Sequence, residues 1–153
     1  MERPVEIITA ANRMLCQMLM DSGMFLTLVY MSLDREKNML TVVSAGHNPV
    51  YLLNGTDIET IESTGPVLGW DPDDVWDTLE FPFHPGSTLF LYTDGLVEAK
   101  NPVNEEYESR LLDFLSRNSD SPAELVASLH SEVSEFCEGR FDDDMTLFAI
   151  KKL

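Results

Sequence analysis

The chain has 153 residues, with 27 acidic and 10 basic side chains and a formal net charge of −17 at pH 7. Its length is that of one domain that can bury a core without disulfides, and its 44% hydrophobic and 24% charged residues exclude wholesale disorder. A chain this acidic repels phosphate backbones and anionic lipid headgroups, so we expect neither a nucleic acid nor a membrane as partner. The acidity suits cation binding or a basic protein partner, and a plainly solvated surface explains it equally well.

The cysteines and the chain's start predict a cytoplasmic protein. Cys16 and Cys137 lie far apart in helical patterns and form no Cys-x-x-Cys pair, so we expect two small buried apolar residues in a reducing compartment. The uncharged apolar stretch over residues 22–33 has 12 residues and is too short to span a bilayer. The first residues lack the continuous apolar run of a signal peptide.

The first predicted element is a helix over residues 4–20, which Gly23 ends. Its apolar side chains recur at the helical spacing of 3.6 residues: Ile7, Ile8, Ala11, Met14, Leu15 and Met18. Residues 25–33 are apolar on both faces, which predicts a strand covered on two sides. Residues 39–45 form a second strand, and the charged stretch 34–38 joins the two as a hairpin.

The middle of the chain predicts further antiparallel strands. Residues 50–53 and 57–61 flank Asn54-Gly55, a strong hairpin pattern in which both turn positions are expected to have positive φ. After a loop rich in Gly, Pro and Asp, residues 75–83 and 88–92 are predicted as two more strands.

The last third predicts two helices and a strand. A helix is expected over residues 105–115, and a second one starts at a capping box formed by Ser121 and Glu124. The second helix carries apolar residues on one face: Val126, Leu129, Val133 and Phe136. Residues 145–150 form the final strand. Antiparallel strands with helices outside them predict an α+β layered domain, and no Gly-x-Gly-x-x-Gly or Gly-Lys-Ser phosphate loop is present.

Two acidic segments stand next to apolar strands. Asp94, followed by Gly95, comes directly after strand 88–92, and residues 142–144 are three consecutive Asp before the last strand. If these two strands are neighbours, Asp94 and Asp143 converge at one end of the sheet, where carboxylates without Cys or His select a hard cation such as Mg²⁺ or Mn²⁺. An Asp-Gly turn and a solvated acidic loop explain the same residues without a metal.

Other chemistries find no support in the sequence. No Ser lies in a Gly-x-Ser-x-Gly elbow, which excludes a serine hydrolase of that type. A haloacid-dehalogenase-type phosphatase needs Asp where Tyr92 stands. His47 is expected to hydrogen-bond within its loop, and His84 and His130 are expected to be structural.

Four short motifs together resemble a known family. They are residues 44–49 (Ser-Ala-Gly-His-Asn-Pro), 65–69 (Gly-Pro-Val-Leu-Gly), 93–99 (Thr-Asp-Gly-Leu-Val-Glu-Ala) and 143–146 (Asp-Asp-Met-Thr). Their order and spacing resemble the bacterial metal-dependent PPM/PP2C-type serine/threonine phosphatases, in the branch of the sporulation stage II protein E and Rsb-type enzymes. The resemblance implies a sandwich of two antiparallel sheets flanked by helices, with two Mn²⁺ or Mg²⁺ ions at one edge.

The resemblance also implies roles for individual residues. Asp94 and Asp143 match the family's metal ligands, with Gly95, Asp144 and Thr146 as supporting or backbone candidates. His47 falls where another branch has a metal-associated Asp, so we assign it no metal. The implied substrate is a phosphoserine or phosphothreonine on a protein of the anti-sigma-factor-antagonist type, attacked by a water that the ions activate.

One family motif has no match in this chain. The family's Gly-Asp-x-x-Gly-His-Gly segment, which supplies the carboxylate that bridges both ions, does not occur, and Asp21-Ser22-Gly23 is no substitute. The sequence therefore predicts a single, N-terminally incomplete phosphatase domain over residues 1–153, weakly active or inactive by itself, with exposed sheet edges that favour a homodimer. The alternative is a non-catalytic module that binds a phosphoprotein or another partner.

Overall fold

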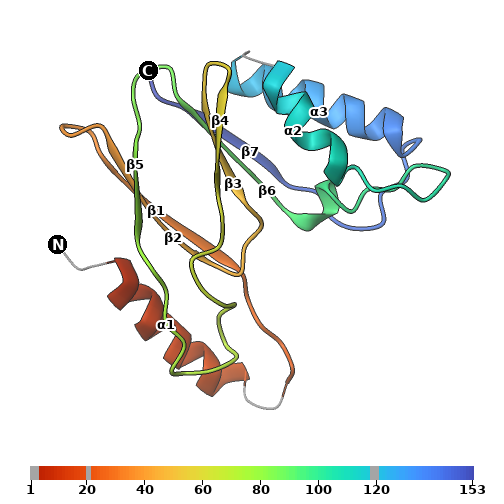
Figure 1. The fold of residues 1–153 in the computed structure, drawn as a ribbon. Helices are drawn as coiled ribbons and strands as arrows, with labels where there is room; N and C mark the ends of the chain where they lie inside the picture. Colours follow the sequence, from red (N-terminus) through yellow and green to blue (C-terminus); the bar gives the residue numbers. More distant parts are fainter. Residues whose placement is uncertain (1–3, 20–21, 118–120) are drawn as a thin grey trace. The chain divides into compact units, whose positions relative to one another are not determined.

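The computed structural model describes residues 4–19, 22–117 and 121–153, and the chain divides into two compact units (Figure 1). The first unit is Met1–His47 with Glu62–His84, and the second is Asn48–Ile61 with Pro85–Leu153. The described residues form two antiparallel sheets and three α-helices, which confirms the predicted α+β class. None of these helices has both the length and the hydropathy that crossing a bilayer requires.

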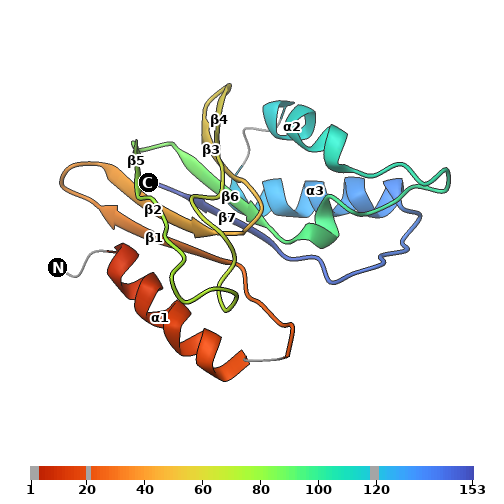
Figure 2. The same ribbon diagram turned by 60° about the horizontal axis from the view of Figure 1, so that its bottom comes forward.

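The first unit combines one helix with a three-stranded sheet. It contains α1 (Pro4–Leu19), β1 (Leu28–Asp34), β2 (Met39–Ala45) and β5 (Leu79–Pro82), with the strands in the order β1-β2-β5. Figure 2 shows α1 alongside this sheet, and Ile8 packs there with Val43 and Ala45 of β2. The predicted helix and the predicted β1–β2 hairpin are both confirmed.

A buried asparagine fixes α1 to the loop that follows β4. Asn12 has no exposed surface, and its Nδ2 donates to the Asp71 carbonyl oxygen at 2.7 Å. Its Oδ1 accepts from the Gly69 amide at 2.8 Å, so both ends of the side chain are paired. The Cys16 thiol also lies 3.6 Å from Asn12 Oδ1 and is only half-buried, whereas Cys137 is buried as predicted.

Two expectations for the first unit are wrong in the described chain. The strand predicted to be covered on two sides is β1, an edge strand whose Leu28 and Leu33 are exposed. On α1, Ile8 is buried, but Met14 is 64% and Met18 75% exposed, so the helical periodicity overstated the width of the buried face.

The strand predicted over residues 75–83 is shortened to β5. The Trp76 indole N–H donates to the Pro66 carbonyl oxygen and the Asp77 amide donates to the Thr64 carbonyl oxygen. These bonds hold residues 76 and 77 against the loop at 64–66, so pairing with β2 begins only at Leu79.

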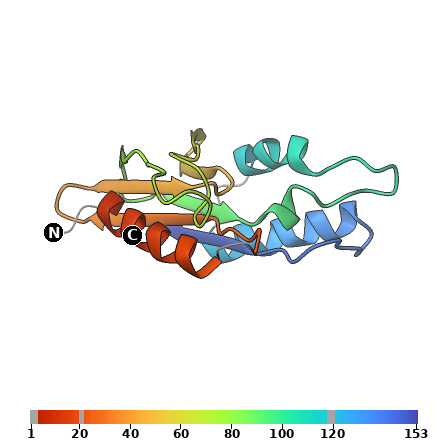
Figure 3. The same ribbon diagram turned by 90° about the horizontal axis from the view of Figure 1, so that it is seen from below.

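The second unit combines a four-stranded sheet with two helices. Its elements are β3 (Val50–Asn54), β4 (Asp57–Ile61), β6 (Thr88–Tyr92), the short 3₁₀ helix η1 (Asp94–Leu96), α2 (Glu108–Arg117), α3 (Pro122–Phe136) and β7 (Leu147–Lys151). The strand order is β4-β3-β6-β7. Figure 3 shows α2 and α3 next to one another, and both contribute to one core that includes Phe90, Leu111 and Leu129.

The β3–β4 hairpin is confirmed, but its turn is displaced by one residue from the predicted one. Asn54 pairs with Asp57, so the turn residues are Gly55 and Thr56. Only Gly55 of these has positive φ, at 65°. This is the pattern of a type II′ turn, which needs glycine at its first central position.

The helix predicted over residues 105–115 begins later, at Glu108. The Asn101 side-chain oxygen accepts from the Val103 and Glu105 amides, and the Tyr107 amide donates to the Ala99 carbonyl oxygen. The Glu105 carbonyl oxygen, which would accept the first bond of a helix starting at residue 105, accepts instead from the Asn101 amide. The capping box of α3 is confirmed, since Ser121 and Glu124 bond reciprocally.

Candidate metal centre

The two acidic segments lie at the same end of the second sheet. β6 and β7 pair antiparallel, with Tyr92 opposite Leu147 as the last pair. Asp94 comes two residues after β6 ends, and Asp143 comes four residues before β7 begins. The condition set by the sequence, that these strands be neighbours, is therefore met.

Thr93 joins the two segments beyond the last strand pair. Its amide donates to the Thr146 carbonyl oxygen at 3.1 Å, and its Oγ1 accepts from the Thr146 amide at 2.8 Å. The same hydroxyl donates to the Asp144 carbonyl oxygen at 3.2 Å. The Thr146 amide is thus taken by a side chain, which explains why β7 starts at Leu147 instead of the predicted residue 145.

Gly95 lets the segments approach closely. It is buried, and a Cβ built on it would lie 2.6 Å from the Asp144 carbonyl oxygen and 3.3 Å from that of Asp143. Any other residue would have to push this segment away, because Cβ atoms essentially never come so near a backbone oxygen. The Asp-Gly order is therefore required by packing here, independently of any turn.

Both candidate ligands are exposed carboxylates with a free oxygen. Asp94 Oδ1 accepts from the Gly95 amide at 3.1 Å, and Asp143 Oδ1 accepts from the Asp144 amide at 2.7 Å. No described residue donates a hydrogen bond to Oδ2 of either one. Each short local bond orients its carboxylate and leaves lone pairs for a further partner.

This donor set fits a hard cation, with most of the ion's coordination left to water. Mg²⁺ is commonly held by one or two carboxylates while keeping several waters. Within the described ranges, no group of three or more His, Cys, Asp or Glu side chains is arranged to hold an ion. At this end of the sheet the candidate ligands for Mn²⁺ or Mg²⁺ are Asp94 and Asp143.

The other predicted site residues divide between the two units. Gly95, Asp144 and Thr146 all lie at the β6–β7 end described above. His47 is the last residue of the first unit, in the loop after β2, and is half-buried. Thr93 was quoted in a motif but given no role by the sequence, because a hydroxyl's partners depend on strand pairing that a motif does not encode.

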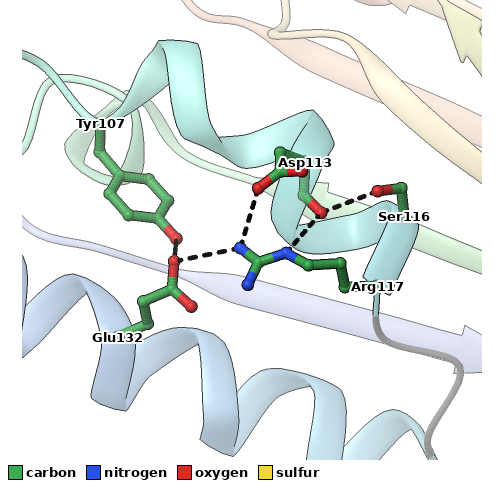
Figure 4. Close-up of polar contacts among 5 residues, drawn as sticks. All are labelled: Tyr107, Asp113, Ser116, Arg117 and Glu132. Atoms are coloured by element: carbon green, nitrogen blue, oxygen red, sulfur yellow. Dashed lines mark hydrogen bonds and ion pairs between the residues drawn. The ribbon is translucent and has the colours of Figure 1, made fainter.

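A second polar cluster links α2 to α3, as Figure 4 shows. The buried Tyr107 hydroxyl donates to Glu132 Oε1 at 2.8 Å. Arg117 reaches Asp113 at 3.0 Å and Glu132 at 3.9 Å. Burial, followed by the Glu132 hydrogen bond, raises the pKa of Tyr107 well above its usual range. None of these groups belongs to the Asp94–Asp143 site.

Comparison with known sequences places the whole chain in one family. Residues 2–152 match the model of the stage II sporulation protein E (SpoIIE) family. Protein IcfG of Synechocystis sp. is 32% identical over 133 residues, covering 85% of this chain and 21% of that protein. Phosphoserine phosphatase RsbU of Bacillus subtilis is 26% identical over 154 residues, covering 97% of this chain and 45% of that protein. The chain thus spans less than half the length of these curated relatives.

Solved structures agree on the fold. The SiaA-PP2C domain of Pseudomonas aeruginosa superposes with a TM-score of 0.84 at 19% identity, covering 97% of this chain and 60% of that one. The Mn-presoaked phosphatase domain of the cell fate determinant SpoIIE from Bacillus subtilis gives 0.70 at 17% identity, covering 99% and 67%. The chain therefore belongs to the SpoIIE family of PPM-type phosphatases and has a PP2C-like fold.

Proposed function

We propose that this chain is a single phosphatase-type domain that takes part in metal-dependent dephosphorylation of phosphoserine or phosphothreonine on a protein. One observation carries the proposal: β6–β7 pairing sets Asp94 and Asp143 at one sheet end, in a chain that matches the SpoIIE family over residues 2–152. The name of the relative RsbU, a phosphoserine phosphatase, supports the reaction type. By the family resemblance, the substrate is a phosphorylated anti-sigma-factor antagonist in the cytoplasm.

In this proposal the chain's own residues supply the metal ligands and fix their orientation. Asp94 and Asp143 present oxygen ligands, and the local bonds to the amides of Gly95 and Asp144 fix their carboxylate planes. These residues would hold Mn²⁺ or Mg²⁺, which when bound would supply an activated water and offset negative charge on the phosphoryl oxygens. The family site holds two ions, whereas the described residues here provide two carboxylates and no larger group. We therefore expect this chain by itself to bind metal incompletely and to be weakly active or inactive.

The family motif without a match in this sequence, Gly-Asp-x-x-Gly-His-Gly, favours a second candidate function. A chain of this fold that holds no complete metal site is suited to binding a phosphoprotein without hydrolysing it. The two candidates differ in one measurable respect, since the phosphatase proposal requires Mn²⁺ and the binding module does not.

The first test is calorimetric titration of Mn²⁺ into the wild-type chain, Asp94→Asn and Asp143→Asn, with Asp57→Asn as the control. Asp57 is an exposed carboxylate at the β3–β4 turn, so its change removes the same charge away from the site. We expect each site variant to weaken Mn²⁺ binding by at least about 10-fold, since even groups that only support a ligand produce that loss. The proposal is contradicted if the wild-type chain does not bind Mn²⁺, or if neither Asp94→Asn nor Asp143→Asn changes the affinity.

Hydrolysis of a phosphoserine peptide separates the remaining possibilities. We expect slow, Mn²⁺-dependent release of phosphate that Asp94→Asn abolishes. Fast release that Asp94→Asn abolishes would overturn the expectation of weak activity but keep the metal site. Peptide binding without Mn²⁺ and without release would favour the binding module.

We extend the proposal to self-association. β1 and β5 are the outer strands of one sheet and β4 and β7 those of the other, so in the described chain each has one unpaired backbone edge. Such edges pair readily with another chain. Sedimentation velocity on the purified chain tests whether it forms a dimer.

A further inference from the structure

We propose that Thr93 is a positioning residue that sets the distance between the two carboxylate-bearing segments. The inference rests on the proposed function, because it concerns the same Asp94–Asp143 site. It assigns to the Thr93 hydroxyl the task of holding the loop that carries Asp143 against the turn that carries Asp94.

The first argument is that residues 142–146 depend on Thr93. Three hydrogen bonds tie this acidic segment to the rest of the second unit among the described residues, and all three involve Thr93. One is made by the Thr93 amide and two by its Oγ1. The ladder bonds of β7 begin only at Leu147. The side chain of Thr93 therefore supplies two of the three polar attachments of this segment, in which Met145 also packs against the core.

The second argument is that the hydroxyl both donates and accepts a hydrogen bond. A threonine hydroxyl has one proton to donate and lone pairs to accept with. Here the proton goes to the Asp144 carbonyl oxygen and a lone pair takes the Thr146 amide. Valine has the same shape but can make neither bond, and serine can make both.

The third argument is that the loop is held at two residues just after Asp143. Residue 144 is bonded through its carbonyl oxygen and also lies against Gly95, while residue 146 is bonded through its amide. Asp143 sits immediately before this fastened stretch, and Asp94 is the next residue after Thr93. One side chain thus couples the backbone positions of both ligands, and groups that orient ligands in this way typically change metal affinity about 10- to 100-fold when removed.

The test compares Thr93→Val with Thr93→Ser, using Thr60→Val as the matched control. Thr60 is an exposed threonine on β4, so the same isosteric change is made in the same sheet. We expect Thr93→Val to weaken Mn²⁺ binding by about 10- to 100-fold in calorimetry. Thr93→Ser should restore binding to within a few-fold of wild type, and Thr60→Val should leave it unchanged.

A second readout needs no metal. Hydrogen exchange of the Thr146 amide, followed by NMR in the metal-free chain, should be faster in Thr93→Val and unchanged in Thr93→Ser. If Thr93→Val does not fold by circular dichroism, Thr93→Ala removes the same hydroxyl and replaces it in both measurements.

Each outcome bears on a distinct claim. Faster Thr146 exchange with unchanged Mn²⁺ affinity overturns the positioning role and leaves the metal site standing. Unchanged exchange shows that the hydroxyl does not hold the loop and also overturns the inference. If wild-type chain binds no Mn²⁺, or binds it regardless of Asp94→Asn and Asp143→Asn, the proposed metal site fails and the role of Thr93 fails with it.

Discussion

Tyr107 is the largest side chain without exposed surface in the described chain. Its buried hydroxyl has one hydrogen-bond acceptor, the Glu132 carboxylate. Its hydroxyl bonds to Glu132, and its ring meets Phe136 edge-on with centroids 5.3 Å apart. The Arg110 guanidinium lies 4.7 Å from the centroid of the same Phe136 ring. This group of residues fastens α2 to α3 and has no part in the acidic site.

The raised pKa of Tyr107 predicts a measurable alkaline effect. Above the ordinary value of 10.0 the unfolded chain loses this proton while the folded chain keeps it. The unfolded state then binds fewer protons, so stability falls as pH rises from about 10 towards the folded pKa. Tyr107→Phe should cost about 1 kcal/mol near neutral pH, and the difference from wild type should narrow above pH 10.

Urea unfolding at neutral and alkaline pH measures both parts of this prediction. A tyrosinate absorbance titration supplies the control, because Tyr107→Phe should remove one of the four tyrosines, and that one ionises above the ordinary pKa of 10.0. A gap between the two proteins that widens above pH 10 would contradict the assignment.

Sequence patterns predicted the candidate ligands of the Asp94–Asp143 site but not the hydrogen bonds around them. Asp94 and Asp143 were found because they follow and precede apolar strands. Thr93 and the buried Asn12 were missed, since a polar residue reveals its partners only after folding. Asn12 lies on the buried side of α1 and bonds to residues 57 and 59 positions away.

Periodicity located the start of α1 at Pro4 and both ends of β2, Met39 and Ala45. The predicted end of α1 at residue 20 lies outside the described residues. The starts of α2, β5 and β7 moved because Asn101, the loop at 64–66 and Thr93 take the backbone groups first. The spacing of apolar residues does not reveal a hydrogen bond to a neighbouring loop, so the predicted starts of these three elements were wrong.

The N-terminal cap of α3 predicts a pH-dependent stability. The Ser121 hydroxyl accepts from the Glu124 amide and donates to the Glu124 carboxylate at 2.7 Å. The side-chain bond to Ser121, then the bond from the Ser121 amide, lowers the pKa of Glu124 below its usual 4.5. The stabilisation from this lowered pKa is therefore present above pH 4.5 and is lost as pH falls through the lowered pKa.

Ser121→Ala should destabilise the chain by about 1 kcal/mol at neutral pH, and by less in acid where the carboxyl is protonated in both proteins. Thermal unfolding at both pH values measures this. Ser128→Ala is the control, because Ser128 is exposed in the middle of the same helix and caps nothing. An equal loss at the two pH values would show that the carboxylate does not contribute to the cap.

For the whole molecule, charge is the dominant feature. The net charge is −17, and the ion pairs of Lys37, Lys100 and Arg117 join side chains that are more than one third exposed. Exposed pairs are worth about 0–1 kcal/mol each, so they do not offset the repulsion among 27 acidic side chains. Salt should therefore stabilise this chain, because screening weakens repulsion beyond about 10 Å at 0.1 M ionic strength.

Urea unfolding in low salt and in about 0.5 M NaCl tests this, with a higher midpoint and an unchanged slope expected in salt. A lower midpoint in NaCl would mean that the few ion pairs outweigh the repulsion.

The same measurement separates general screening from specific cation binding. If Asp94 and Asp143 hold an ion, Mn²⁺ at matched ionic strength should raise the midpoint further than NaCl does. Mass action predicts about 2.7 kcal/mol of added stability when free Mn²⁺ is 100 times its Kd. In Asp94→Asn the extra stabilisation by Mn²⁺ should disappear while the stabilisation by NaCl remains. In Asp57→Asn both stabilisations should remain. Equal responses of Asp94→Asn and wild type to Mn²⁺ would mean that the acidic surface attracts cations without a site, and the carboxylates at the β6–β7 end would then be a solvated turn and loop.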